Sequence, residues 1–130
     1  MYKAVTQNIS VSVKPSFLDE QSDPDRHRYV WAYRVLIENQ GENAVKLLRR
    51  HWRITDSRGD TQTVDGDGVI GEQPVIAAGE SFSYTSGAPL ATPGGFMVGH
   101  YVMADPDGNE FNIDVPAFSL DSPHSIATLN

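Results

Sequence analysis

The fold is decided by the stretch YVWAYRVLI, residues 29–37, in which aromatic and β-branched side chains fall on every second position. Successive side chains of a β-strand point to opposite faces, so this alternation predicts a strand with these side chains in a core. Val30, Ala32 and Leu36 on the other face indicate a central strand that is covered on both sides. The same period of two recurs in shorter runs, separated by clusters of Gly, Pro, Asn and Asp. About seven or eight short strands at this spacing predict an all-β sandwich or barrel.

The punctuation of the chain predicts where these strands begin and end. Val5, Ile9, Val11 and Val13 read as one alternating run that ends at Lys14-Pro15. Residues 39–43, NQGEN, predict a hairpin loop, and residues 105–108, DPDG, predict a tight turn. Residues 116–130 show no periodicity and predict either an ordered segment or a flexible end. No linker interrupts the chain, so residues 1–130 are expected to form a single domain.

Composition excludes several classes of protein. The chain has 130 residues and no cysteine, which rules out disulfides, thiol nucleophiles and cysteine-ligated metals. Seventeen acidic residues against ten basic ones give a net charge of −7, which argues against general nucleic-acid binding. The longest wholly apolar run, Tyr29–Tyr33, is too short to enter a membrane as a span, and the first residues lack a signal-peptide core. A cytoplasmic location without membrane insertion is therefore expected.

A glycine-rich stretch, GDGVIG at residues 66–71, fits the GxGxxG pattern of dinucleotide-binding loops. In those loops a helix follows the glycines, but Pro74 and Gly79 leave room here for at most one helical turn. Two interpretations remain. The amides of Gly66, Gly68 and Gly71 form a small anion-binding nest, or the glycines supply the positive φ of a tight connection. The conformational interpretation is the favoured one.

Half of the basic residues gather in one segment of an otherwise acidic chain: Lys46, Arg49, Arg50, Arg53 and Arg58. The apolar residues of this strand that are expected to face the core are Leu48, Trp52 and Ile54. Arg49, His51 and Arg53 then project together from the other face, about 6.6 Å apart. Arg50 fits this register poorly and is expected to point inward or to lie at a bulge. The exposed row either binds an anion or acidic partner, or pairs with acidic residues on neighbouring strands; pairing is somewhat favoured.

Metal-binding and catalytic motifs find little support. The three Asp-x-Asp pairs, which begin at Asp23, Asp65 and Asp105, lie in turn-forming sequence and lack the further ligands of a calcium loop. The four histidines are far apart in sequence and form no local chelating pair. No nucleophile elbow, metalloprotease or Walker motif is present. We therefore expect no catalytic residues, no metal site and no cofactor, with weak binding of a divalent cation or pyrophosphate as an open alternative.

Several segments, in this order and context, resemble bacterial ApaG proteins, also called CorD. They are EQSDP (20–24), YVWAY (29–33), RHW (50–52), GDGVIGEQP (66–74), GESFSYTSG (79–87) and PAFSLDSP (116–123). The resemblance covers essentially the whole chain. It implies a fibronectin type III-like, immunoglobulin-like β-sandwich of two antiparallel sheets. It also implies a link to cobalt resistance and magnesium efflux, no established enzymatic activity, and a pyrophosphate-contacting role for the glycines at 66, 68 and 71.

Three functional hypotheses follow, in order of preference. The first is a non-enzymatic interaction module that binds a protein partner. The second is a small-anion binder, for pyrophosphate or a nucleotide, in which Gly66, Gly68 and Gly71 act with Arg49, His51 and Arg53 and with an optional divalent cation; a phosphohydrolase is its enzymatic variant. The third, direct sensing of cobalt or magnesium, is prompted by the family resemblance and has little support in the sequence, which offers neither thiols nor clustered histidines.

Overall fold

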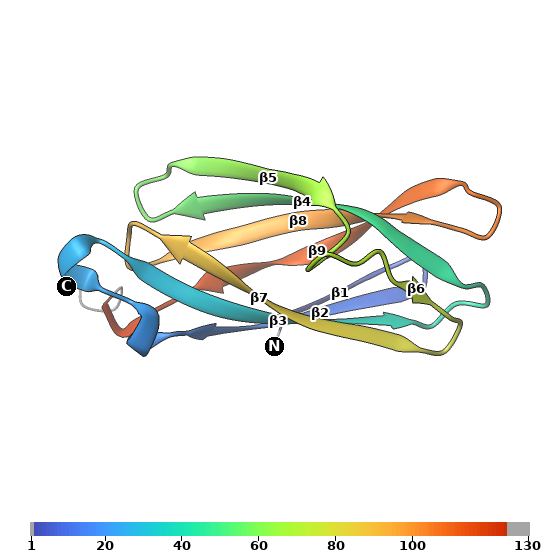
Figure 1. Ribbon diagram of the computed structural model, residues 1–130, viewed down its shortest axis with the longest axis horizontal. Helices are drawn as coiled ribbons and strands as arrows, with labels where there is room; N and C mark the ends of the chain where they lie inside the picture. Colours follow the sequence, from blue (N-terminus) through green and yellow to red (C-terminus); the bar gives the residue numbers. More distant parts are fainter. Residues whose placement is uncertain (1, 125–130) are drawn as a thin grey trace.

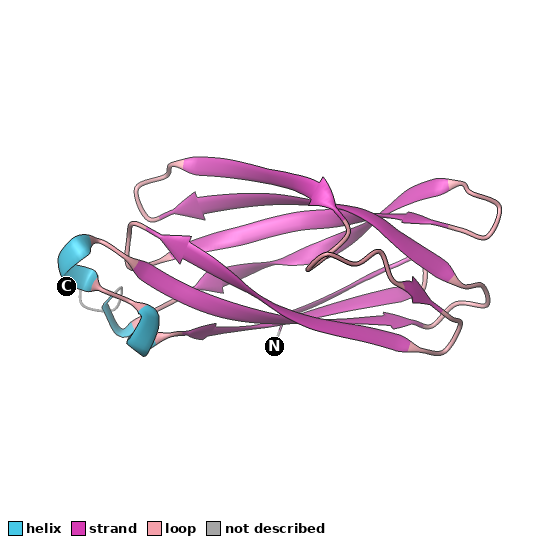
Figure 2. Cartoon of the chain, viewed as in Figure 1, coloured by secondary structure: helices cyan, strands magenta, loops and turns pink. Residues whose placement is uncertain are grey.

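Two antiparallel sheets face one another in the computed structural model, which describes residues 2–124 (Figure 1). Figure 2 shows that strands are the dominant element of this chain, with two short 3-10 turns, η1 (Asp19–Gln21) and η2 (Pro24–Arg26). The predicted all-β sandwich is confirmed, with nine strands in the described part rather than seven or eight. They are β1 (Tyr2–Thr6), β2 (Ile9–Phe17), β3 (Tyr29–Asn39), β4 (Val45–Asp56), β5 (Thr61–Asp67), β6 (Val75–Ile76), β7 (Ser81–Leu90), β8 (Gly95–Ala104) and β9 (Glu110–Leu120).

The strand order places β3 and β4 in different sheets. The first sheet runs β1-β2-β3-β7 and the second runs β5-β4-β8-β9, with β6 paired to β4. The predicted hairpin loop at residues 39–43 is therefore wrong, because this loop crosses from one sheet to the other. Asn39 fixes the crossing: its side-chain amide donates to the carbonyls of Asn43 and Ile76, and its side-chain oxygen accepts from the amide of Gly41.

The N-terminal run is two strands rather than one. Gln7 and Asn8 take positive φ values of 49° and 64° and turn the chain between β1 and β2. β2 also continues through Pro15 to Phe17, so Lys14-Pro15 does not end it. The pattern of hydrogen bonds explains why proline is tolerated here. The nitrogen of Pro15 faces away from β3, and β1 starts at Tyr2, opposite Val13, so it does not extend as far as Pro15.

The core lies between the sheets and is rich in aromatic rings. Trp52 packs edge-on against Tyr33 and Phe118, with ring centres 5.5 and 6.0 Å apart, which joins strands of both sheets. Trp31 is almost fully buried, and its indole N–H donates to the carbonyl of Asp121 at 2.7 Å. The alternating residues of the opening stretch thus form the centre of the core, as the period of two predicts.

The predicted C-terminal tail begins inside a strand. β9 extends to Leu120, and its residues 118–120 pair with residues 95–97 at the start of β8. Val115 and Phe118 are both buried although three positions separate them, because the register shifts between Met97 and Gly99 of β8. This bulge breaks the alternation and hides the end of the strand from periodicity. Residues 125–130 of the predicted tail lie outside the described residues.

Candidate functional site

The basic row on β4 projects from the outer face of the second sheet. The side chains of Arg49 and Arg53 are exposed and that of His51 is half-buried. Trp52 and Ile54, which point to the opposite face of β4, are buried. Leu48, expected in the core, is only half-buried because the register between β4 and β8 shifts there, and Leu47 takes the fully buried position instead. The structure therefore brings Arg49, His51 and Arg53 together as predicted, but with a bulge at the beginning of the row.

Carboxylates from both neighbouring strands pair with two members of this row. Arg49 forms an ion pair with Glu110 of β9, and Nδ1 of His51 lies 2.6 Å from Oδ1 of Asp65 on β5. Among the described residues, Arg53 has no side-chain hydrogen bond or ion pair. Two of the three groups proposed for an anion site thus already have acidic partners, as the pairing hypothesis expects.

Arg50 points inward and contacts the glycine-rich stretch directly. Its Nη1 donates to the carbonyl oxygens of Asp67 at 3.0 Å and Gly68 at 2.9 Å. A Cβ atom added to Gly66 would lie 2.8 Å from the guanidinium of Arg50, so a larger residue there would displace the guanidinium from its present position. The carbonyls of this stretch, rather than its amides, face the arginine, and the amide of Gly68 donates to the carbonyl of Leu48.

The rest of the stretch is a tight hairpin. Val69 and Glu72 exchange two backbone hydrogen bonds around Ile70 and Gly71, whose φ values are 43° and 80°. Positive φ at both central residues defines a type I′ turn. Gly68 has φ +62°, and a Cβ there would lie 2.0 Å from the carbonyl oxygen of Glu72. Each glycine of the motif therefore has a conformational or steric reason, and Ile70 stands out as a β-branched residue in a left-handed conformation.

Three tyrosines lie buried between the sheets near Arg50. Tyr33, Tyr84 and Tyr101 come from β3, β7 and β8, and the hydroxyls of Tyr84 and Tyr101 share a hydrogen bond. Burial raises the pKa of all three phenols above the usual 10.0, and the nearby charge of Arg50 opposes the rise. Sequence reasoning predicted these rings as core residues but missed the polar cluster that they form with Arg50.

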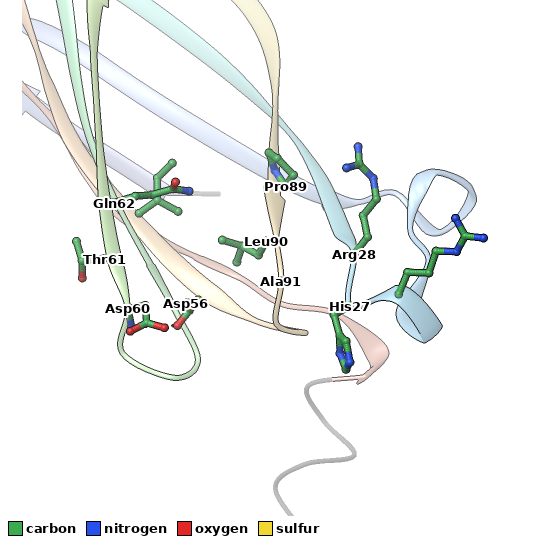
Figure 3. Close-up of a pocket in the computed structure, with 11 residues that line it drawn as sticks. His27, Arg28, Asp56, Asp60, Thr61, Gln62, Pro89, Leu90 and Ala91 are labelled. Carbon is green, nitrogen blue, oxygen red and sulfur yellow. The ribbon is translucent and has the colours of Figure 1, made fainter.

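An open cleft of about 620 Å³ lies at one end of the sandwich, between the β4–β5 turn, the end of β7 and the η2 turn. Figure 3 shows Asp56 and Asp60 on one side of it and His27 and Arg28 on the other, with Leu90 between them. One of these carboxylates already accepts hydrogen bonds from the backbone: Oδ1 of Asp56 accepts from the backbone N–H groups of Arg58 and Asp60. The cleft was not predicted, because the turns that line it are far apart in sequence.

The Asp-x-Asp pair that begins at Asp105 acts in local structure, whereas Asp65 and Asp67 lie on strand β5 and not in the turn that the sequence predicts. Oδ1 of Asp105 accepts from the amides of Asp107 and Asn109, which confirms the turn predicted at 105–108. Hydrogen bonds, the largest from the backbone of Asn109, lower the pKa of Asp105 below its usual value. In residues 2–124 no three His, Asp or Glu side chains lie together as a set of metal ligands, and no helix there is long and apolar enough to cross a membrane.

The fold and the paired outer face define an antiparallel β-sandwich domain with a glycine-rich hairpin at one sheet edge. The chain belongs to the ApaG domain family (DUF525), whose model matches residues 19–105. It is 55% identical to Protein ApaG of Sinorhizobium fredii and 57% identical to that of Paramagnetospirillum magneticum, each over the full length of both chains. It is also similar to the crystal structure of a putative ApaA protein from Bordetella pertussis, with 45% identity, a TM-score of 0.85, and 88% and 94% of the two chains covered.

Proposed function

We propose that this chain is a non-enzymatic interaction module of the cytoplasm, which binds an extended segment of a partner protein along β5 and the hairpin after it. One observation carries the proposal: the segment from β5 to β6 exposes three large apolar side chains. Val64, Ile70 and Val75 are 37%, 56% and 66% exposed. Three of the five large apolar side chains that are exposed among the described residues therefore lie on this one segment, which favours it as a binding surface.

The free edge of β5 offers backbone groups to such a partner. Among the strands of residues 2–124, β5 pairs with β4 alone, and its hydrogen-bonded pairs are set by the bonds from Gly68 to Leu48 and from Asp56 to Asp60. Because these pairs alternate in an antiparallel ladder, the N–H and C=O groups of Thr63 and Asp65 point to the open side. An added strand would satisfy them, which is a common mode of peptide recognition.

The charge next to this edge indicates what the partner carries. Arg53 lies opposite Thr63 and lacks an ion-pair partner among the described residues. An acidic side chain on a strand added beside Thr63 would be about 10 Å from the Arg53 backbone, within reach of an arginine and a carboxylate together. We therefore infer an extended acidic segment. Through this partner the module would serve the cobalt resistance and magnesium efflux that the ApaG resemblance implies.

Photo-crosslinking in cells tests this proposal. A photoreactive amino acid is placed at Val64, and at Val5 as the control, since Val5 is an apolar side chain that is 58% exposed on β1. We expect a discrete adduct at position 64 that disappears in Thr63→Pro, because proline removes an outward N–H and leaves the β4 ladder intact. Circular dichroism of the Thr63→Pro variant is the control for its folding. Identical adducts at both positions, or an adduct that Thr63→Pro leaves unchanged, would contradict the proposal.

A small-anion site at the hairpin is the second candidate. The two bonds that close the turn do not use the N–H groups of Ile70 and Gly71, and these amides remain for a phosphate oxygen. NMR titration with pyrophosphate and nucleotides, with and without Mg²⁺, tests it. Shifts confined to the amides of residues 66–71, and weakened in Arg53→Gln, would support an anion site; no localised shift at millimolar ligand would remove it.

A further inference from the structure

Four titratable residues form a straight row across the outer face of the second sheet. Asp65, His51, His100 and Asp114 occupy directly opposed positions on β5, β4, β8 and β9, the four strands that lie side by side in Figure 1. The rings of His51 and His100 are stacked, with centres 5.0 Å apart and planes 28° apart. The sheet thus brings together two histidines that are 49 positions apart in the chain.

The contact with Asp65 fixes how His51 presents its ring. A carboxylate only accepts hydrogen bonds, so Nδ1 of His51 donates the proton across the 2.6 Å contact with Asp65. The neutral ring then carries its lone pair on Nε2. This arrangement, with a carboxylate on one ring nitrogen and a free lone pair on the other, is the one found behind metal-ligating histidines. Asp114 holds the equivalent register position beside His100.

We propose that His51 and His100 form a surface site for one divalent transition-metal ion of the zinc and nickel class. Imidazole nitrogens bind such ions at about 2.0–2.1 Å, so two nitrogens share an ion when they are about 4 Å or less apart. Since the ring centres lie 5.0 Å apart, the site requires the His100 ring to rotate about its Cβ–Cγ bond while Asp65 holds His51 in place. Since the described residues hold no set of three ligands, water completes the coordination.

The charges around the row favour a cation. The outer face around the two histidines carries four carboxylates, Asp65, Asp67, Glu110 and Asp114, and three cationic side chains, those of Lys46, Arg49 and Arg53. The surplus of one negative charge lowers the free energy of a bound divalent ion. This site lies on the open face of the sheet rather than at the β5 edge, so it does not depend on partner binding there.

Titration of the intact chain with Zn²⁺ tests the site, by calorimetry and by NMR of the histidine ring nitrogens. We expect saturable binding of one ion that shifts Nε2 of His51 and a ring nitrogen of His100 and leaves the Nδ1 proton of His51 in place. His51→Ala or His100→Ala should weaken binding at least ~10-fold, and Asp65→Asn about 10-fold. His27→Asn is the matched control, since asparagine tolerates the left-handed backbone at His27 and should bind Zn²⁺ like the wild type.

Each other outcome would overturn the proposal. No saturable binding at millimolar Zn²⁺ would show that the two rings only stack. Equal affinity in the wild type, His51→Ala and His100→Ala would place the ion elsewhere on the acidic surface. Circular dichroism and the melting temperature of each variant without metal separate a lost ligand from a lost fold.

Discussion

Backbone strain at the tip of the glycine-rich hairpin should reverse the usual ranking of alanine and glycine. Ile70 has φ +43°, and a left-handed conformation costs an L-residue about 1–2 kcal/mol. Glycine avoids this cost but loses about 0.5–1 kcal/mol through its freer unfolded chain. Ile70→Ala and Ile70→Gly both remove the side chain beyond Cβ, so the loss of its partial burial largely cancels between them. The Gly variant should therefore be more stable than the Ala variant by about 0.5–1 kcal/mol.

Urea unfolding followed by tryptophan fluorescence measures this difference, which corresponds to about 2–4 °C in melting temperature. Val75 provides the control, because it is also exposed and is not among the residues with positive φ. There Val75→Gly should be less stable than Val75→Ala by about 0.5–1 kcal/mol. If Ile70→Gly were the less stable variant of its pair, as at Val75, the strain attributed to the hairpin tip would be refuted.

The same variants separate stability from binding. If Ile70 is kept at this strained position to contact a partner, Ile70→Gly should keep a folded sandwich yet lose the adduct formed through position 64. A variant that is more stable than Ile70→Ala and still forms the adduct would leave the strain without the proposed role. Functional positions that carry a stability cost of this kind are common in proteins.

Three further predictions concern the glycines, Arg50 and the buried tyrosines. Gly68→Ala should lower the free energy of unfolding by about 3 kcal/mol or more, because its Cβ would lie 2.0 Å from the Glu72 carbonyl oxygen. Gly108→Ala is the control: its Cβ would have open space around it, so this variant should lose only about 1 kcal/mol. Urea unfolding measures both values. Arg50→Met should lower the free energy of unfolding by about 1–3 kcal/mol, because it removes the hydrogen bonds to two backbone carbonyls. In a double-mutant cycle, Gly66→Ala should cost less stability in the Arg50→Met background, because the guanidinium that would clash with the new Cβ is absent. Additive effects would contradict the contact between residues 50 and 66. Burial raises the pKa of Tyr33, Tyr84 and Tyr101, so their contribution to stability is present below pH 10.0 and is lost as the pH rises through the folded-state pKa. An absorbance titration should show that three of the five tyrosines ionise only above the normal range. If all five tyrosines ionised in the normal range, the prediction would be wrong.

Periodicity predicted the fold well because burial acts on every strand in the same way. The alternation at residues 29–37 was sufficient to place Trp31, Tyr33 and Val35 in the core, and all three are buried. It failed where the ladder itself is irregular. The bulges at Leu47/Arg49 and Met97/Gly99 shift the inward phase by one residue. The alternation therefore wrongly predicts Leu48 in the core and does not predict the end of β9. A bulge depends on the partner strand, which a local pattern does not contain.

The candidate site shows the same limit more sharply. That Arg49, His51 and Arg53 share a face follows from β4 alone, and the structure agrees. What each of them meets depends on the strand order β5-β4-β8-β9, which places residues 65, 100, 110 and 114 around the row. Sequence alone therefore predicts a row of cationic side chains on β4, but in the sheet each of these side chains has a different neighbour. Arg49 is neutralised by Glu110, Arg53 has no ion-pair partner within residues 2–124, and His51 lies between the carboxylate of Asp65 and the ring of His100. The chemistry of this face belongs to the sheet rather than to the strand, and for that reason His51 and His100 must be tested as a pair.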